Sequence, residues 1–155
     1  MIRFTIALFA VAFLVTPLRA EDKAKAAERD MKALQGNWTV TAAHRDGKKL
    51  TDAERAGDLL LTGLVIENDK VQLKFKADNA IDWYFELNPS VTPKIAKIGE
   101  QNDKKSYVLY AVEGDKLTII YMPKEGEDRN KLPAKLETKP DDGAYMLVFE
   151  RAKKK

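Results

Sequence analysis

The sequence predicts a mainly β protein, an antiparallel up-and-down β-barrel of about eight strands preceded by one N-terminal helix. After Gly36, segment after segment alternates between apolar and polar residues with a period of two. Turn signals such as Asp46-Gly47 and Gly114-Asp115 separate these segments. Helical patterns do not alternate with the strands, so parallel βαβ units are not expected. One-sided alternation indicates antiparallel strands with one buried face, and closure into a barrel removes exposed edges.

The composition excludes several kinds of site. The chain has 155 residues, a formal charge of +3, no cysteine and one histidine. Disulfides, a thiol nucleophile and cysteine-ligated zinc are therefore excluded. A catalytic triad or a multi-histidine metal site would depend on His44 alone, and we expect no cofactor.

Residues 1–20 have the pattern of a secretory signal peptide. Arg3 precedes an apolar run of about 12 residues, Pro17 breaks it, and Ala20 stands before the acidic Glu21. The run is short for a membrane span, which needs roughly 20 residues. We expect cleavage after Ala20 and export to the periplasm or the cell exterior, with no stable membrane anchor once the signal is cleaved. An uncleaved N-terminal anchor is the alternative.

Charge outside this segment is nearly balanced. Without Arg3 and Arg19 the chain keeps 25 basic and 24 acidic residues, and four of the basic ones lie in 151–155. Residues 152–155 are interpreted as a solvated basic tail. The rest of the chain is slightly acidic, so we expect no nucleic-acid partner.

Residues 21–36 are predicted to form the N-terminal helix. Ala24, Ala27, Met31 and Leu34 recur on one helical face, and Gly36 follows where a C-cap favours positive φ. The apolar face is narrow and rich in alanine, so this helix should pack against a larger body.

Residues 37–151 are predicted to form the barrel domain. Thr51 and Glu54 have capping-box spacing, which predicts a short helical turn over 51–56. Residues 123–142 are interpreted as a long polar loop. The expected strands are 37–45, 59–67, 70–76, 81–87, 94–98, 106–113, 116–122 and 145–151.

Alternation also predicts the barrel lining. On the first strand it places Trp38, Val40, Ala42 and His44 on the inner face. The lining is rich in aromatic rings, which favours a filled barrel or a shallow pocket near one end. Apolar residues predicted on the outer side, candidates for a protein contact, are Tyr84, Val108 and Ile120. The other expected inner residues are Leu64, Ile66, Val71, Leu73, Phe75, Trp83, Phe85, Tyr110, Val112, Leu117, Ile119, Tyr121, Leu147 and Phe149.

The segment Gly36-Asn37-Trp38 resembles the opening G-x-W strand of lipocalin-like barrels, in which the tryptophan closes one end. Further pieces follow in a characteristic order, among them 64–71, 85–89, 110–117 and 147–151. In that order the chain resembles the Planctomycetes uncharacterised domain family over about residues 31–151. The resemblance implies an exported lipocalin-like domain of unknown function, with no catalytic residues to transfer.

Four residues are candidates for ligand binding: His44, Tyr110, Tyr121 and Trp83. A histidine at the barrel end would orient a ligand or titrate near pH 6.5, and the alternative is a strand-end histidine beside the Asp46-Gly47 turn. The two tyrosines would offer hydroxyls, or else be core aromatics with one satisfied OH. The acidic loop residues lack EF-hand spacing, so no metal site is expected.

These observations favour an exported barrel that binds a small apolar or amphipathic molecule. The alternative is a filled barrel that acts as a structural or protein-interaction module with an envelope protein as partner. An enzyme is the least favoured class, because the sequence has no Gly-rich phosphate loop, HExxH or GxSxG motif.

Overall fold

The computed structural model describes residues 20–58, 61–76, 79–123 and 126–153. The predicted signal peptide lies almost wholly outside these residues. Within them the elements are α1 (Ala20–Leu34), β1 (Gly36–Arg45), β2 (Lys48–Lys49), α2 (Asp52–Asp58), β3 (Leu61–Glu67), β4 (Lys70–Phe75), β5 (Ala80–Asn88), β6 (Ile95–Glu100), β7 (Asp103–Glu113), β8 (Lys116–Tyr121), a 3-10 turn (Arg129–Lys131) and β9 (Tyr145–Arg151).

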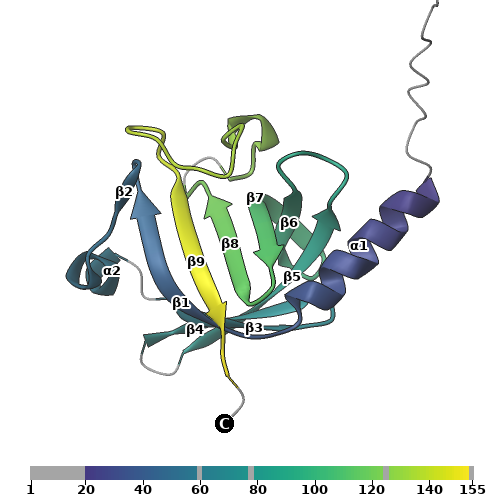
Figure 1. The fold of residues 1–155 in the computed structure, drawn as a ribbon, viewed down its shortest axis with the longest axis horizontal. Coiled ribbons are helices and arrows are strands. Elements are labelled where there is room, and N and C mark those ends of the chain that lie inside the picture. The colour runs from purple at the N-terminus through teal and green to yellow at the C-terminus, as the bar shows by residue number, and fades with distance from the viewer. Residues whose placement is uncertain (1–19, 59–60, 77–78, 124–125, 154–155) are drawn as a thin grey trace, which may run out of the picture.

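The strands form one antiparallel sheet that closes on itself, as predicted. From β3 to β9 each strand pairs with the next along the chain, and β1 pairs with both β3 and β9. Eight strands therefore make the barrel, while β2 is a short extra strand on the edge of β1. Figure 1 shows the closure, with β1 and β9 side by side.

Helix α1 packs against one end of the barrel, where β1 begins and β9 ends; we call this the helix end. Leu34 is buried there, and its carbonyl accepts a hydrogen bond from Trp38 Nε1 at 2.8 Å. The Arg151 guanidinium lies 4.1 Å from the centroid of the Trp38 ring and donates to the carbonyls of Gln35 and Ala33. These contacts join the C-terminus of α1 to Trp38 of β1 and to the end of β9.

A β-bulge in β1 corrects one prediction. The pairing with β9 runs Val40 to Phe149 and then Ala42 to Val148, so Thr41 has no partner. The extra residue reverses the phase of the strand. Ala43 instead of Ala42 is fully buried, and His44 turns to the outer face, opposite Met146. The prediction that Ala42 and His44 lie inside was therefore wrong.

Two residues predicted as exposed on the outer side are buried instead. Val108 has the same parity as Tyr110 and lies buried in the barrel interior. Ile120 does face outward, but it is fully buried in a second apolar cluster beneath the loop that follows β8. This outer cluster consists of Leu109, Ile120, Met122 and Ala144, with Leu132 and Leu136 packed against it.

Local turn chemistry agrees with the sequence. Asp46 and Gly47 both have positive φ, 49° and 75°, as the two central residues of a type I′ hairpin turn require. Thr51 and Glu54 cap α2 reciprocally, with the Thr51 N–H donating to Glu54 Oε2 at 2.7 Å and the Glu54 N–H donating to Thr51 Oγ1 at 3.3 Å.

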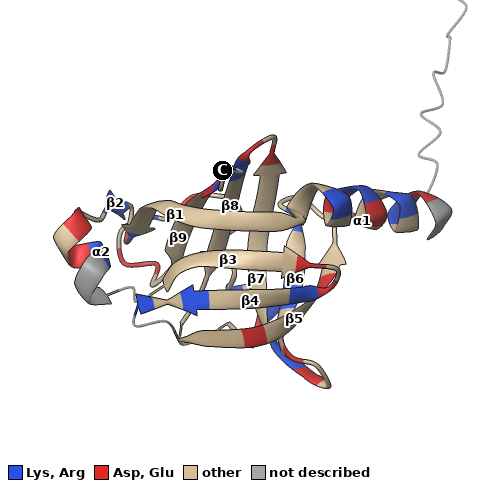
Figure 2. Ribbon diagram, turned by 90° about the horizontal axis from the view of Figure 1, so that it is seen from below, with Lys and Arg blue, Asp and Glu red and all other residues tan. Residues whose placement is uncertain are grey.

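Charged residues lie on the outside of the barrel. In Figure 2 charged residues are found on α1, along β4 and in turns between strands. On β4, Lys70 Nζ pairs with Asp82 of β5 at 2.7 Å. No helix among the described residues is both long enough and apolar enough to span a membrane.

Candidate functional site

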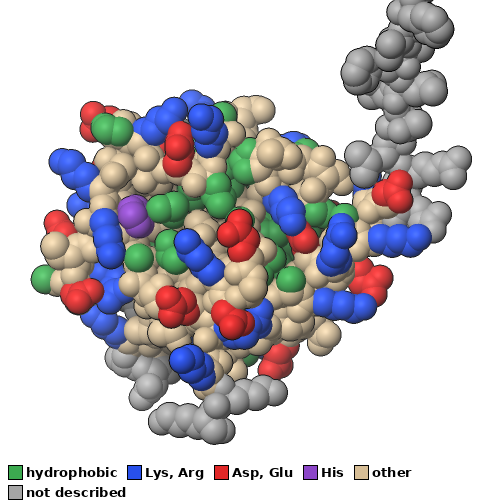
Figure 3. All heavy atoms as spheres, viewed as in Figure 1, with side chains coloured by type: hydrophobic (Ala, Val, Ile, Leu, Met, Phe, Trp, Pro, Cys, Tyr) green, Lys and Arg blue, Asp and Glu red, His purple; other side chains and the backbone are tan. Residues whose placement is uncertain are grey.

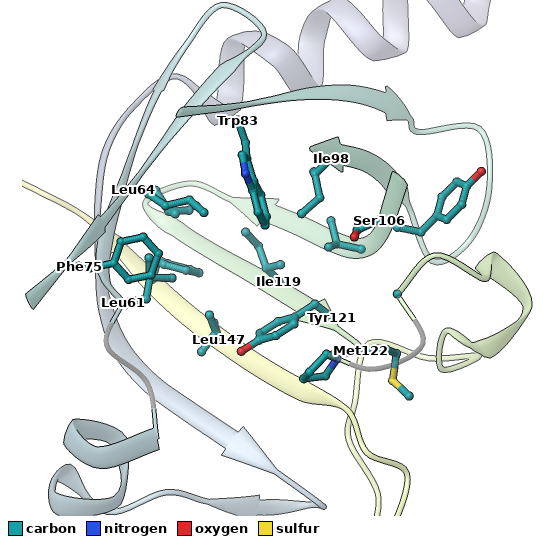
Figure 4. Close-up of a pocket in the computed structure, with 16 residues that line it drawn as sticks. Leu61, Leu64, Phe75, Trp83, Ile98, Ser106, Ile119, Tyr121, Met122 and Leu147 are labelled. Atoms are coloured by element: carbon teal, nitrogen blue, oxygen red, sulfur yellow. The ribbon is translucent and has the colours of Figure 1, made fainter. Parts of the chain in front are cut away.

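The interior of the barrel contains a cavity of about 500 Å³ at the end opposite α1, which we call the cavity end. Figure 4 shows side chains from β3, β4, β5, β6, β7, β8 and β9 around it. The described residues that line it are Leu61, Leu64, Leu73, Phe75, Trp83, Ile98, Ser106, Tyr107, Val108, Ile119, Tyr121, Met122, Pro123, Gly126, Leu147 and Phe149.

The cavity arises because large and small residues are distributed unequally along the barrel. Toward the helix end, Phe85, Tyr110 and Leu117 fill the centre and leave a void of only about 50 Å³. At the cavity end, Ser106 and Gly126 contribute little volume. The barrel is therefore filled in one half and hollow in the other, which agrees with the expectation of a pocket near one end.

The described residues in the wall of the cavity are uncharged. Among the described residues that line it there is no Lys, Arg, His, Asp or Glu. Its polar side-chain groups include the hydroxyls of Ser106 and Tyr121 and the indole N–H of Trp83. The wall thus fits an apolar molecule that carries few polar atoms.

Tyr121 is fixed at the rim of the cavity. Its ring stacks on Tyr145 with centroids 5.5 Å apart and an interplanar angle of 27°. In Figure 4 its hydroxyl points inward, toward Leu147. Burial, with a smaller contribution from Tyr145, raises the pKa of Tyr121 to about 12. The phenol is therefore protonated at neutral pH and can donate a hydrogen bond.

Tyr110 lies in the filled half of the barrel and does not line this cavity. It is 3% exposed, and its hydroxyl donates to Asp30 Oδ2 of α1 at 2.9 Å. Lys94 Nζ lies 2.7 Å from the same oxygen and 2.9 Å from Asp30 Oδ1. Burial, followed by the bond to Asp30, raises the pKa of Tyr110 far above its ordinary value. This tyrosine joins α1 to the barrel.

His44 is separated from the cavity by the barrel wall. It is half-buried on the outer face beside the β1–β2 turn, where its strand partner is Lys49. Figure 3 shows the histidine in purple on this outer surface. Burial, and then the positive charge of Lys49, lowers the pKa of His44. The structure matches the alternative of a strand-end histidine.

A second hollow of about 500 Å³ adjoins the cavity on the outside and shares Met122 and Pro123 with it. Arg45 and three aspartates line it: Asp46, Asp141 and Asp142. The Arg45 Nη1 donates to the Tyr145 hydroxyl at 3.3 Å. Across the described part of the chain, no group of three or more His, Cys, Asp or Glu side chains is arranged to hold a metal ion.

Of the four candidate binding residues, the structure brings Trp83 and Tyr121 together around one cavity. Sequence reasoning missed Ser106 and Met122. Ser106 has the same strand parity as Tyr110, which could have placed it inside. It also missed Asp30, although Asp30 lies on the helical face that carries Ala27, Met31 and Leu34.

Comparison with known proteins adds no relatives. No protein-family model matches the chain, and neither the curated proteins nor the solved structures contain a significant match.

Proposed function

We propose that this protein binds a small apolar or amphipathic molecule inside its barrel, as an exported lipocalin-like domain. The observation that carries the proposal is the cavity of about 500 Å³ at one end of the barrel, whose described lining residues are all uncharged. Its volume lies in the range of small-molecule sites, roughly 300–1,000 Å³. Transfer of an apolar ligand from water into such a site is favourable in proportion to the apolar surface buried.

Export, and membership of the Planctomycetes uncharacterised domain family, are part of the proposal. They are supported by the signal-peptide pattern of residues 1–20 and by the order of short sequence pieces from Gly36 to Arg151. A non-catalytic role is proposed with them. The alternative, an envelope interaction module with a filled barrel, finds support only in the packed half around Phe85 and Tyr110.

The test is binding of the neutral fluorescent probe N-phenyl-1-naphthylamine to the purified protein. We expect saturable fluorescence enhancement. Ile119 lines the cavity, and Thr118 precedes it on the outer face of β8. Ile119→Trp should therefore block binding, while the matched control Thr118→Trp should not.

Native mass spectrometry of the protein from its own host gives the second readout. A bound small molecule is expected. Absence of probe uptake and of any bound mass would contradict the proposal and would favour the interaction module.

A further inference from the structure

We propose that the cavity selects neutral ligands bearing a hydrogen-bond-accepting oxygen, such as a ketone, aldehyde, ester or alcohol, and that Tyr121 binds this oxygen. This inference rests on the proposed function and names the ligand class. Tyr121 is thereby a specificity-determining residue.

The first observation is a phenol that faces the cavity without an internal partner. Within the described part of the chain, no group forms a hydrogen bond with the Tyr121 hydroxyl. Every fully buried side-chain oxygen or nitrogen in that part has a partner, so the unpartnered Tyr121 hydroxyl is not fully buried. The hydroxyl therefore remains accessible from the cavity space. The hydroxyl of Tyr145, on which Tyr121 stacks, does have a partner, because it accepts a hydrogen bond from Arg45.

The second observation is the position of Tyr121. It is the last residue of β8, and Met122 and Pro123 follow it at the rim. Figure 4 shows Leu64 and Trp83 across the cavity from Tyr121, and Phe149 also lines it. A ligand oxygen bonded to Tyr121 would leave the apolar body of the ligand directed toward these side chains.

The third observation concerns charge. An ionised group in the cavity would lose hydration without gaining an opposite charge, since no charged residue is found among the described lining residues. An anionic group held at the rim instead would face the outer hollow, where Asp46, Asp141 and Asp142 outnumber Arg45. Both positions disfavour a carboxylate.

The test uses ligands of nearly identical shape: 2-ethylnaphthalene, 2-acetylnaphthalene and 2-naphthoate, each displacing N-phenyl-1-naphthylamine at pH 7.5. In the parent protein, we expect 2-naphthoate to bind at least about tenfold more weakly than 2-acetylnaphthalene, because only the former is charged. Tyr121→Phe should weaken binding of 2-acetylnaphthalene about three- to tenfold, the effect of one net hydrogen bond. It should leave 2-ethylnaphthalene within about twofold.

Tyr145→Phe is the matched control, because it removes a hydroxyl from the same aromatic stack outside the cavity. It should change neither affinity beyond about twofold. Two results would overturn this inference: equal losses for the ethyl and acetyl compounds in Tyr121→Phe, or binding of 2-naphthoate as tightly as 2-acetylnaphthalene. Failure of 2-ethylnaphthalene and the probe to bind at all would instead overturn the proposed function.

Discussion

Asp30, Tyr110 and Lys94 join α1 to the barrel through hydrogen bonds and an ion pair. The interaction between Asp30 and Tyr110 should be measurable as a coupling energy in a double-mutant cycle. Asp30→Ala leaves the Tyr110 hydroxyl buried without its acceptor, at a cost of about 1–3 kcal/mol. Lys94 is 39% exposed and can regain hydration, so its lost ion pair adds at most about 1 kcal/mol. We expect a total destabilisation of about 1–4 kcal/mol.

Tyr110→Phe should cost less, about 1–2 kcal/mol, because Asp30 keeps both contacts with Lys94. In the double variant no hydroxyl is left unsatisfied. The double variant should therefore lose less free energy of unfolding than the sum of the two single losses, by about 1–2 kcal/mol.

Urea unfolding at pH 7, followed by tryptophan fluorescence and circular dichroism, gives the four free energies of unfolding. Single losses that add to within about 0.3 kcal/mol would refute the reasoning, because they would mean that the two groups do not interact.

Three further predictions concern the framework. Arg151→Lys should lower stability by about 1–2 kcal/mol in urea unfolding, because an ammonium cannot both lie flat on Trp38 and donate to the helix carbonyls. Unchanged stability would show that the guanidinium plane is unimportant. Gly63→Ala should shift the thermal midpoint down strongly, because a Cβ atom would lie 2.4 Å from the Trp38 carbonyl oxygen; a midpoint within about 2 °C of the parent would contradict this. The raised pKa of Tyr121 means that the unfolded chain loses this proton first. Stability should therefore fall between pH 10 and about 12, by about 1.4 kcal/mol per pH unit for this group. Tyr121→Phe should show a shallower fall, and identical profiles would refute the assignment.

Period-two alternation predicted most of the barrel because most strands are regular. On β4, Val71, Leu73 and Phe75 face inward as the pattern indicates. The same rule failed on β1 after Thr41, where a bulge changes the phase. Nothing in the run Thr-Val-Thr-Ala-Ala-His marks that bulge, because small and polar residues fit either face.

The candidate site was predicted only in part, for a related reason. Trp83 and Tyr121 follow strand parity and were placed correctly on the inner face. Parity gives the side of the sheet, but it does not give the height along the barrel axis. It therefore could not separate Tyr110 in the filled half from Tyr121 at the rim. The outward Ile120 looked exposed because its cover comes from a loop with no periodic pattern.

The division of the barrel into a filled half and a hollow half separates the contacts that join α1 to the barrel from the rim of the proposed binding cavity. The contacts of Trp38, Arg151 and Asp30 lie at the opposite end from Ser106 and Tyr121. Side chains at the rim of the cavity, such as Ser106 and Tyr121, can therefore be exchanged without disturbing these contacts. Leu64, Val108 and Phe149 also line the cavity but belong to the buried core, so they are less suited to exchange. Such a scaffold is suited to randomisation of its rim for the selection of new small-molecule receptors.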